Sequence, residues 1–478
     1  MTKLPSNPCD ASLTEIATAL ASRQISSVEV TEASCVRLQT YGRALNAVAG
    51  IDVDDACAQA SNADRSSNDA GVLAGVPLAH KDMFYRPGRL SECGSKVRAG
   101  FLPVTLSGAL KKLDQAGALD VARLNMAEFA FGVTGHNEIT GNVHNPWNPD
   151  HMTGGSSSGS GAMVAARATF GALGSDTGGS VRLPAACCGV VGMKVTMGRV
   201  SRYGAMPLSH TLDTIGPLTR TVADNALMLS VLAGHDPDDA SSADIPGGDY
   251  LGNLEGGVKG MKIGLPTSHF MDGITSELGD RFQAAVDVLK SAGAEIVDVD
   301  LPDAIQHTNA LTSLITATEG AALHQHWLET KREEYGAQTF GRLAGGLSTP
   351  ATRYIQALNL RTELLAEFNE MVFGHVDVLM TPMMIMDVPT IEESDVRAGP
   401  GAGELLSKVG HCSRPVNFLG LPGLSVPSGF TKSGLPSSIQ FVGRPFDEAT
   451  LYRVGRAYER ETMWCDAQPD PAIWDAAS

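Results

Sequence analysis

The chain has 478 residues, of which 43% are hydrophobic and 19% are charged, so it can bury a large core and lacks the composition of a disordered protein. Its formal net charge is −17 and it has no cluster of Lys and Arg, which argues against a surface that neutralises nucleic-acid phosphates. The eight cysteines show no zinc-binding spacing, and no stretch reads as a signal peptide or a membrane span. We expect a soluble, cytoplasmic protein with a small-molecule partner.

Two helices are predicted at the N-terminus, because each of two serines is followed three residues later by a glutamate and then by apolar residues at helical spacing. The pairs are Ser12 with Glu15 and Ser26 with Glu29. Each matches a capping box, in which both side chains bond to backbone N–H groups at the start of a helix. The apolar run 72–79 then predicts a buried strand that delivers His80, Lys81 and Asp82 at its end.

The rest of the chain alternates between helical and extended patterns. A helix over 107–115 precedes a strand over 119–124, and a helix over 275–290 precedes a strand over 294–299. Further predicted elements are strands over 261–265 and 376–382, a hairpin of strands over 423–427 and 437–442, and a last helix over 447–460. This alternation predicts an α/β fold: a single large domain with a mixed, mostly parallel β-sheet covered by helices on both faces.

A run rich in Gly and Ser, 151–163, and its continuation, 174–184, are candidates for the chemistry. The run leads directly into small apolar residues, which is the composition of a core and not of a flexible linker. A phosphate-binding loop is disfavoured because no Gly-Lys-Ser or Gly-Lys-Thr follows. A metal site built on His136, His144 and His151 is disfavoured because no pair has i, i+4 spacing.

The sequence pattern Gly-x-Ser-x-Gly at 155–159 matches the nucleophile elbow of serine hydrolases. That motif follows a strand, however, and here a loop of Pro and Asn precedes it. Serine chemistry with a lysine as the base remains, in which a neutral lysine replaces histidine. Segments 154–162 and 174–194 are similar to the signature of the amidase signature family. Segment 75–82 resembles the strand that carries the catalytic lysine of that family, and 212–220 and 417–423 also fit.

The resemblance covers nearly the full chain and implies one amidase domain over 1–478. Within it we expect three parts: a helical N-terminal layer (1–65), a catalytic signature core (70–230) and a variable substrate-pocket region (300–410). The last part is the hardest to interpret, with mixed helix and loop and Gly-rich patches at 341–346 and 399–403.

The resemblance also implies a role for each matching residue. Ser180 would be the nucleophile, Ser156 the bridging serine that follows a cis peptide bond, and Lys81 the base. Backbone N–H groups of the turn would form the oxyanion hole, and the 129–131 segment would contact the substrate; the residues in this group are Thr177, Gly178, Gly179, Ser180 and Ala130. No cofactor and no metal are implied. His80 and Val195 depart from the pattern of the family.

Physical reasoning supports the same assignment. A lysine is protonated at neutral pH unless burial makes its charged form costly, and Lys81 ends an apolar strand. Neutral Lys81 would take a proton from Ser156 as Ser156 takes one from Ser180. Asp176 and Arg182 flank the turn that carries Ser180, and we expect them to pair and hold it.

Our first hypothesis is a stand-alone amidase that cleaves the C–N bond of a small linear amide, carbamate or ureido compound. We expect it to bind no nucleic acid directly and no membrane, and a homodimer is an open possibility. The alternative is the glutaminase subunit of a tRNA-dependent amidotransferase complex. Against this alternative, the sequence shows no clear arginine clamp for a glutamine carboxylate, for which Arg342 and Arg353 are only candidates. A catalytically silent binding protein is a third class, which the intact Lys-Ser-Ser set disfavours.

Overall fold

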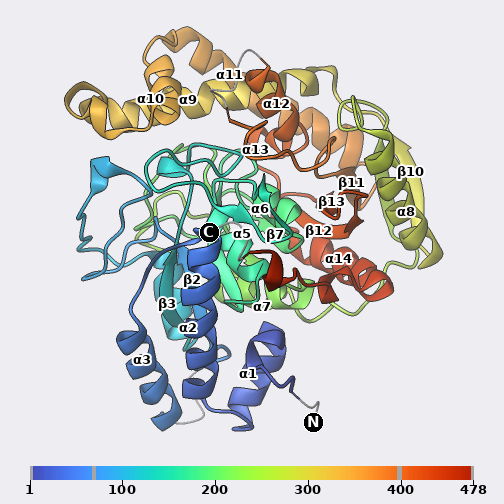
Figure 1. Cartoon of the computed structure of the whole chain (residues 1–478). Coiled ribbons are helices and arrows are strands. Elements are labelled where there is room, and N and C mark those ends of the chain that lie inside the picture. The colour runs from blue at the N-terminus through green and yellow to red at the C-terminus, as the bar shows by residue number, and fades with distance from the viewer. Residues whose placement is uncertain (1–3, 67–70, 396–400, 475–478) are drawn as a thin grey trace.

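The computed structural model describes residues 4–66, 71–395 and 401–474 (Figure 1). Its strands are β1 (Val48–Ile51), β2 (Pro77–Lys81), β3 (Leu119–Leu124), β4 (His144–Asn145), β5 (Asn148–Met152), β6 (Gly171–Asp176), β7 (Val191–Lys194), β8 (Thr214–Thr219), β9 (Lys262–Pro266), β10 (Glu295–Val299), β11 (Val378–Pro382), β12 (Gly423–Phe430) and β13 (Pro436–Val442). Its helices are α1 (Leu13–Ala21), α2 (Ser27–Ala44), α3 (Val53–Arg65), α4 (Gly108–Gln115), α5 (Ser158–Ala165), α6 (Arg182–Cys188), α7 (Val222–Leu232), α8 (Ser276–Ser291), α9 (Thr308–Thr330), α10 (Ala337–Gly346), α11 (Ala351–Phe368), α12 (Ala402–Val409), α13 (Arg414–Phe418) and α14 (Glu448–Thr462).

The two N-terminal helices begin where the capping boxes predict. At the start of α1 the Glu15 N–H donates to Ser12 Oγ at 3.2 Å, and the Ser12 N–H donates to Glu15 Oε2 at 2.8 Å. The same reciprocal pair, Ser26 with Glu29, opens α2. These pairs satisfy backbone donors that a helix leaves without intrahelical partners, so both predictions are confirmed.

The main sheet has eight strands in the order β10-β9-β11-β13-β12-β7-β8-β6. A single α/β domain with a large mixed sheet is confirmed, but the expectation of a mostly parallel sheet is wrong. Among the described strands of this sheet, five of the seven pairings are antiparallel, and only β9 with β10 and β9 with β11 are parallel.

The reason lies in which strands the helices connect. Helix α6 joins β6 to β7, but these two strands are not neighbours, because β8 lies between them and is antiparallel to both. The β12–β13 pair is the predicted hairpin, and a short turn between two strands makes them antiparallel. The alternation of helices and strands therefore predicted the elements, but it did not predict which strands lie next to each other in the sheet.

The lysine-bearing strand is shorter than predicted. Strand β2 begins at Pro77, five residues after the predicted start, and includes Lys81 as its last residue. The segment before it turns at Gly75, whose φ of +75° favours glycine and where a Cβ would lie 2.9 Å from the side chain of Ser27. Strand β2 pairs in parallel with β3, in a second sheet of order β1-β3-β2.

The part of the 300–410 region that the structure describes is mainly helical. Helices α9, α10, α11 and α12 lie together on one side of the molecule, opposite α1, α2 and α3 (Figure 1). The Gly-rich patch predicted at 399–403 falls partly outside the described residues. No helix in the described ranges is long and apolar enough to cross a membrane.

Helix α5 lies in the centre of the core, with every residue from Ser158 to Ala165 buried. Its glycines allow close contact with other backbone segments. A Cβ on Gly159 would lie 2.4 Å from the carbonyl oxygen of Ala47 and 2.6 Å from that of Asn125. The small residues of the Gly/Ser run therefore pack a helix against the backbone, and this fixes the loop that precedes it.

Candidate active site

Lys81 is buried at the end of β2, with 1% of its surface exposed. Its Nζ donates to Ser156 Oγ at 2.7 Å and to Ser175 Oγ at 2.8 Å. Burial lowers the pKa of Lys81 from 10.5 to about 7, although the charges of Asp213 and Asp176 act in the opposite direction. A large fraction of Lys81 is therefore neutral near pH 7 and can accept a proton.

Ser156 follows Gly155 through a cis peptide bond, as the resemblance implies, and this expectation is confirmed. The loop that holds it is tightly packed, since a Cβ on Gly155 would lie 2.5 Å from the backbone nitrogen of Gly135. The Ser156 carbonyl accepts a hydrogen bond of 3.1 Å from the Ala127 N–H. These contacts fix the hydroxyl beside Lys81.

Ser180 lies in the turn between β6 and α6 and faces a cavity. Its carbonyl accepts from the Ser157 N–H at 3.3 Å, which ties the turn to the loop of Ser156. Among the contacts of the described residues, none is a hydrogen bond of the Ser180 hydroxyl. The structure thus brings Lys81, Ser156 and Ser180 together from three separate segments.

Three residues of the turn, Thr177, Gly178 and Ser180, line the same cavity. Contrary to expectation, the Gly179 N–H is already engaged, because it donates to Asp176 Oδ1 at 2.7 Å. Gly179 has a φ of +120°, and a Cβ there would lie 2.5 Å from Ser413 Oγ. Glycine is therefore required at 179 for backbone shape, and its N–H is not available to an oxyanion.

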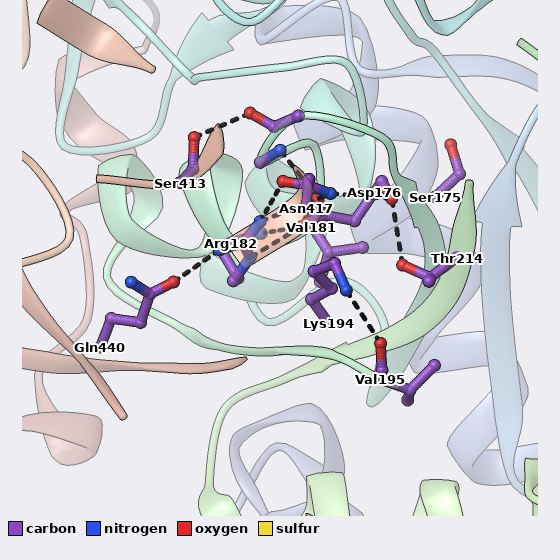
Figure 2. A network of polar contacts seen from close by, with 12 residues as sticks. Ser175, Asp176, Val181, Arg182, Lys194, Val195, Thr214, Ser413, Asn417 and Gln440 are labelled. Atoms are coloured by element: carbon purple, nitrogen blue, oxygen red, sulfur yellow. Dashed lines mark hydrogen bonds and ion pairs between the residues drawn. The ribbon is translucent and has the colours of Figure 1, made fainter. Parts of the chain in front are cut away.

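Asp176 and Arg182 pair as expected, and neither side chain is exposed. Figure 2 shows Arg182 between Asp176, Asn417 and Gln440. Burial raises the pKa of Asp176, but the charge and hydrogen bonds of Arg182 outweigh burial and hold that pKa well below its ordinary value. The ionised carboxylate also accepts from the N–H groups of Val181 and Arg182, so this pair fixes the backbone next to Ser180.

Ser175 is a site residue that the sequence reasoning missed. Its hydroxyl is the second acceptor for Lys81, and it lies near the end of β6, just before the nucleophile segment. Its position between Gly174 and Asp176, inside the segment that matches the family signature, was the available signal. No local pattern distinguished it from the other serines of the run.

His80 departs from the pattern of the family, and the structure explains why it is tolerated. The ring is buried, and its Nδ1 accepts a hydrogen bond of 3.1 Å from the Leu173 N–H. Burial lowers the pKa of His80 to about 4, so the ring is neutral at physiological pH. A neutral histidine here acts as a polar core residue that joins β2 to β6.

The cavity that Ser180 faces has a volume of about 260 Å³. Its wall combines the catalytic turn with the 130–133 segment, α9, α10 and the start of α13; the residues are Ala130, Phe131, Gly132, Val133, Thr177, Gly178, Ser180, Leu208, Thr312, Ser313, Thr316, Ala317, Arg342, Leu406 and Arg414. Ala130 and Phe131 lie in this wall as expected. Phe129 does not, because it packs against His324, Trp327 and Tyr335.

The two candidate arginines separate in the structure. Arg342, on α10, lines the cavity and donates to the Phe131 carbonyl at 2.9 Å. Arg353 is exposed on α11 and is not part of the wall. Arg414 is part of the wall, although the sequence reasoning did not consider it.

This arrangement has the parts that acyl transfer requires. A buried lysine with a lowered pKa bonds a serine hydroxyl, a second serine faces a cavity, and the Gly-rich turn that carries this serine lines the same cavity. The cavity has room for a small acyl group.

Comparisons with known proteins agree with this geometry. The A subunit of the glutamyl-tRNA(Gln) amidotransferase of Geobacter metallireducens is 36% identical over 480 residues, which cover 95% of this chain and 98% of the relative. The corresponding protein of Myxococcus xanthus is 39% identical, over 95% of this chain and 97% of the relative. A solved structure from a vestigial protein complex, related to the origins of an s-triazine catabolic enzyme, superposes with a TM-score of 0.88 at 30% identity, covering 96% of this chain and 100% of that one.

These relatives correct one expectation. We expected a small-molecule amide as the partner, no direct contact with nucleic acid, and a homodimer as an open possibility. The relatives are subunits, and the enzyme that they form is named for a tRNA. The low density of positive charge argued against a nucleic-acid surface, but it carried no information on partner subunits.

A family profile described as Amidase matches residues 29–452, which include each residue that the site brings together. Lys81 donates to Ser156, and Ser180 lines the cavity, within segments that resemble the signature of this family. The chain therefore belongs to the amidase signature family, and it is a hydrolase of carbon–nitrogen bonds.

Proposed function

We propose that Ser180 is the nucleophile of a Ser-Ser-Lys triad. Neutral Lys81 accepts a proton from Ser156 as Ser156 accepts one from Ser180, and Ser180 Oγ then bonds to the carbonyl carbon of a linear carboxamide. Main-chain N–H groups of the 177–180 turn stabilise the oxyanion. The hydrogen bond of 2.7 Å from Lys81 to Ser156 and the lowered pKa of Lys81 support this order of proton transfers.

The remaining steps conserve protons. The C–N bond breaks as Ser156 donates a proton to the leaving nitrogen and recovers one from Lys81, which releases ammonia and leaves an acyl-Ser180. Water then attacks the acyl group through the same relay, gives a carboxylic acid and restores the Ser180 hydroxyl. In this proposal the 70–230 segment supplies the reacting groups and eight of the fifteen residues that line the pocket, and the 300–410 segment supplies six more.

We propose further that the chain is the glutaminase component of a tRNA-dependent amidotransferase complex. Its ammonia would pass to the glutamyl group of a glutamyl-tRNA that partner subunits hold, in the cytoplasm. The similarity to A subunits of glutamyl-tRNA(Gln) amidotransferases over nearly the whole length of both chains carries this proposal. Arg342 supports it, because a guanidinium beside the nucleophile suits the carboxylate of an amino-acid amide.

The test is affinity purification of the tagged chain from its source cells, followed by an assay of the eluate with glutamine and glutamyl-tRNA(Gln). We expect partner subunits to copurify and glutaminyl-tRNA to form. The same eluate carrying Ser180→Ala should keep its partners and lose ammonia release. A chain that purifies alone and converts no glutamyl-tRNA would contradict the proposal.

A further inference from the structure

Two arginines lie in the wall of the cavity beside the nucleophile. Arg342 comes from α10 and Arg414 from the start of α13, and both are half-buried. They flank the reacting end of the cavity. A Cβ on Gly178, two residues before Ser180, would lie 3.8 Å from Arg414 Cγ, and a Cβ on Gly132 would lie 3.7 Å from Arg342 Nη1.

Within the described residues, no carboxylate neutralises either guanidinium. Neither forms an ion pair there. Arg342 donates to the Phe131 carbonyl at 2.9 Å, and Arg414 makes a long bond of 3.4 Å to the Leu406 carbonyl. A guanidinium has five N–H donors, so most of them remain available to a ligand.

Burial places both cations in an unfavourable environment. It lowers the pKa of Arg342 to about 10, with a further contribution from the charge of Arg414, and it lowers the pKa of Arg414 to about 10. Both stay protonated at neutral pH. Two half-buried like charges at one cavity are costly in the free protein, and an anion between them removes that cost.

Three acidic side chains of other segments are engaged elsewhere. Glu128 accepts from Ser95 and from the Gly336 N–H, Asp213 accepts from Thr177, and Glu319 accepts from Ser209, Thr211 and Tyr354. The described residues of the wall itself are apolar, hydroxyl-bearing, glycine or arginine, and none is acidic.

We infer that Arg342 and Arg414 together bind the carboxylate of the amide substrate, and that this pocket selects an acyl group of net negative charge over one that also carries an ammonium group. The inference rests on the proposed hydrolysis and defines the charge of the amide that is cleaved. Glutamine carries both groups, and its ammonium would meet two cations and no described carboxylate. In a complex that uses glutamine, the counter-charge for that ammonium must therefore come from outside the described wall.

The experiment measures ammonia release by the purified full chain from three amides of equal length. The three are glutamine, glutaramate, which is glutamine without its amino group, and pentanamide, which carries a methyl group in place of the carboxylate of glutaramate. We expect kcat/KM for glutaramate to exceed that for glutamine by at least about tenfold, because like charges at close range are strongly unfavourable. It should exceed that for pentanamide by about 100-fold, since pentanamide leaves both guanidiniums without a partner.

Variants separate the role of Arg414 from general damage. Arg414→Leu should lower kcat/KM for glutaramate by about 10- to 100-fold. It should raise kcat/KM for pentanamide, because one guanidinium without a partner is removed, so the preference for glutaramate over pentanamide should shrink. Arg414→Asp should reverse the preference toward glutamine by placing a carboxylate in the wall. Arg353→Leu, an arginine replaced on the exposed surface of α11, is the matched control and should leave all three values unchanged.

Labelling of Ser180 with an uncharged serine-reactive phosphonate shows whether each variant keeps a working nucleophile. Equal or faster hydrolysis of glutamine than of glutaramate by the wild-type chain would overturn the inference while leaving the hydrolase proposal intact. Labelling of Ser180 without turnover of glutaramate would also overturn it. Absence of both labelling and ammonia release would instead refute the proposed triad.

Discussion

At the scale of single residues, the main physical feature of the site is a lysine that burial makes less basic. Lys81 has no acidic partner at hydrogen-bond distance among the described residues, and both of its acceptors are hydroxyl groups, of Ser156 and Ser175. Hydroxyl groups stabilise an ammonium less than a carboxylate does, so desolvation controls the pKa. The residue is therefore suited to cycle its proton, not to hold a fixed charge.

The pH dependence of the reaction follows from this pKa. The neutral form of Lys81 is the base, so kcat/KM should rise with pH to a plateau above about pH 7 and fall about tenfold per unit below it. Initial rates of ammonia release measured from about pH 5.5 to 8.5 check this. Lys81→Met should abolish the rate at every pH, and a flat wild-type profile over the same range would exclude Lys81 as the titrating base.

The buried pair beside the nucleophile makes a second prediction. Arg182→Met would leave the Asp176 carboxylate buried without its cation and remove donors to Asn417 and Gln440. We expect a loss of about 3–5 kcal/mol in the free energy of unfolding, measured by urea titration. As a control, Arg460→Met removes an ion pair with Glu255 in which both side chains are more than half exposed, and it should cost less than about 1 kcal/mol.

The sequence was sufficient to single out site residues that lie within a recognisable segment of the chain. Ser156 and Ser180 lie in one run and Lys81 ends an apolar strand, and the resemblance of these segments to the amidase signature family singled them out. Arg414 and Ser175 were missed for different reasons. Arg414 lines the same cavity as Ser180 because two segments more than 200 residues apart pack together, which no local pattern reveals. Ser175 is one serine among several in the run, and its neighbours in the sequence do not distinguish it.

At the scale of elements, the helix that follows the bridging serine depends on glycines that lower its intrinsic helix propensity. Helix α5 contains Gly159 and Gly161, where alanine would be the better helix former. The structure shows why glycine is present: backbone atoms of Ala47 and Asn125 approach Gly159 directly. Close backbone packing therefore outweighs low helix propensity in α5. The spacing of apolar residues in the sequence did not indicate this packing.

The corresponding test compares two glycines in helices. Gly159→Ala should destabilise the protein by about 1–3 kcal/mol, because the new methyl group would overlap two backbone carbonyl oxygens. Gly279→Ala in α8 meets nothing within 4 Å and should stabilise the protein by about 0.5–1 kcal/mol. Thermal unfolding followed by circular dichroism measures both. Stabilisation by both substitutions would show that α5 can move away from its neighbours.

At the scale of the whole molecule, local patterns predicted most elements and failed on their arrangement. The capping boxes, the hairpin and the helix–strand pairs are encoded within a few residues, and they were found with small errors at the ends. Neighbour order in the main sheet depends on contacts between distant strands, such as β12 with β7. No periodicity in a single sequence contains that information, which is why the sheet was expected to be mostly parallel.

Trp474, the last residue that the structure describes, packs against α2 and the 146 segment, and this gives a prediction for the molecule as a whole. Trp474 is 2% exposed, its indole N–H donates to the Pro146 carbonyl at 2.8 Å, and its ring meets Tyr41 of α2 edge-on at 4.7 Å. Trp474→Ala should cost about 3–5 kcal/mol in unfolding free energy. Urea titration checks this, with Ile473→Ala as the control, because Ile473 is 37% exposed. Equal, small effects of the two substitutions would contradict a structural role for the C-terminal contact.

The wall of the substrate cavity is drawn from two stretches of chain that are far apart. The serines and the lysine come from residues 81–180, whereas both arginines come from 342–414. The proton relay and the two cations of the wall therefore lie on separate stretches of the chain. A chimera that carries residues 308–418 of a relative on this scaffold should keep an intact relay and acquire the charge preference of the donor.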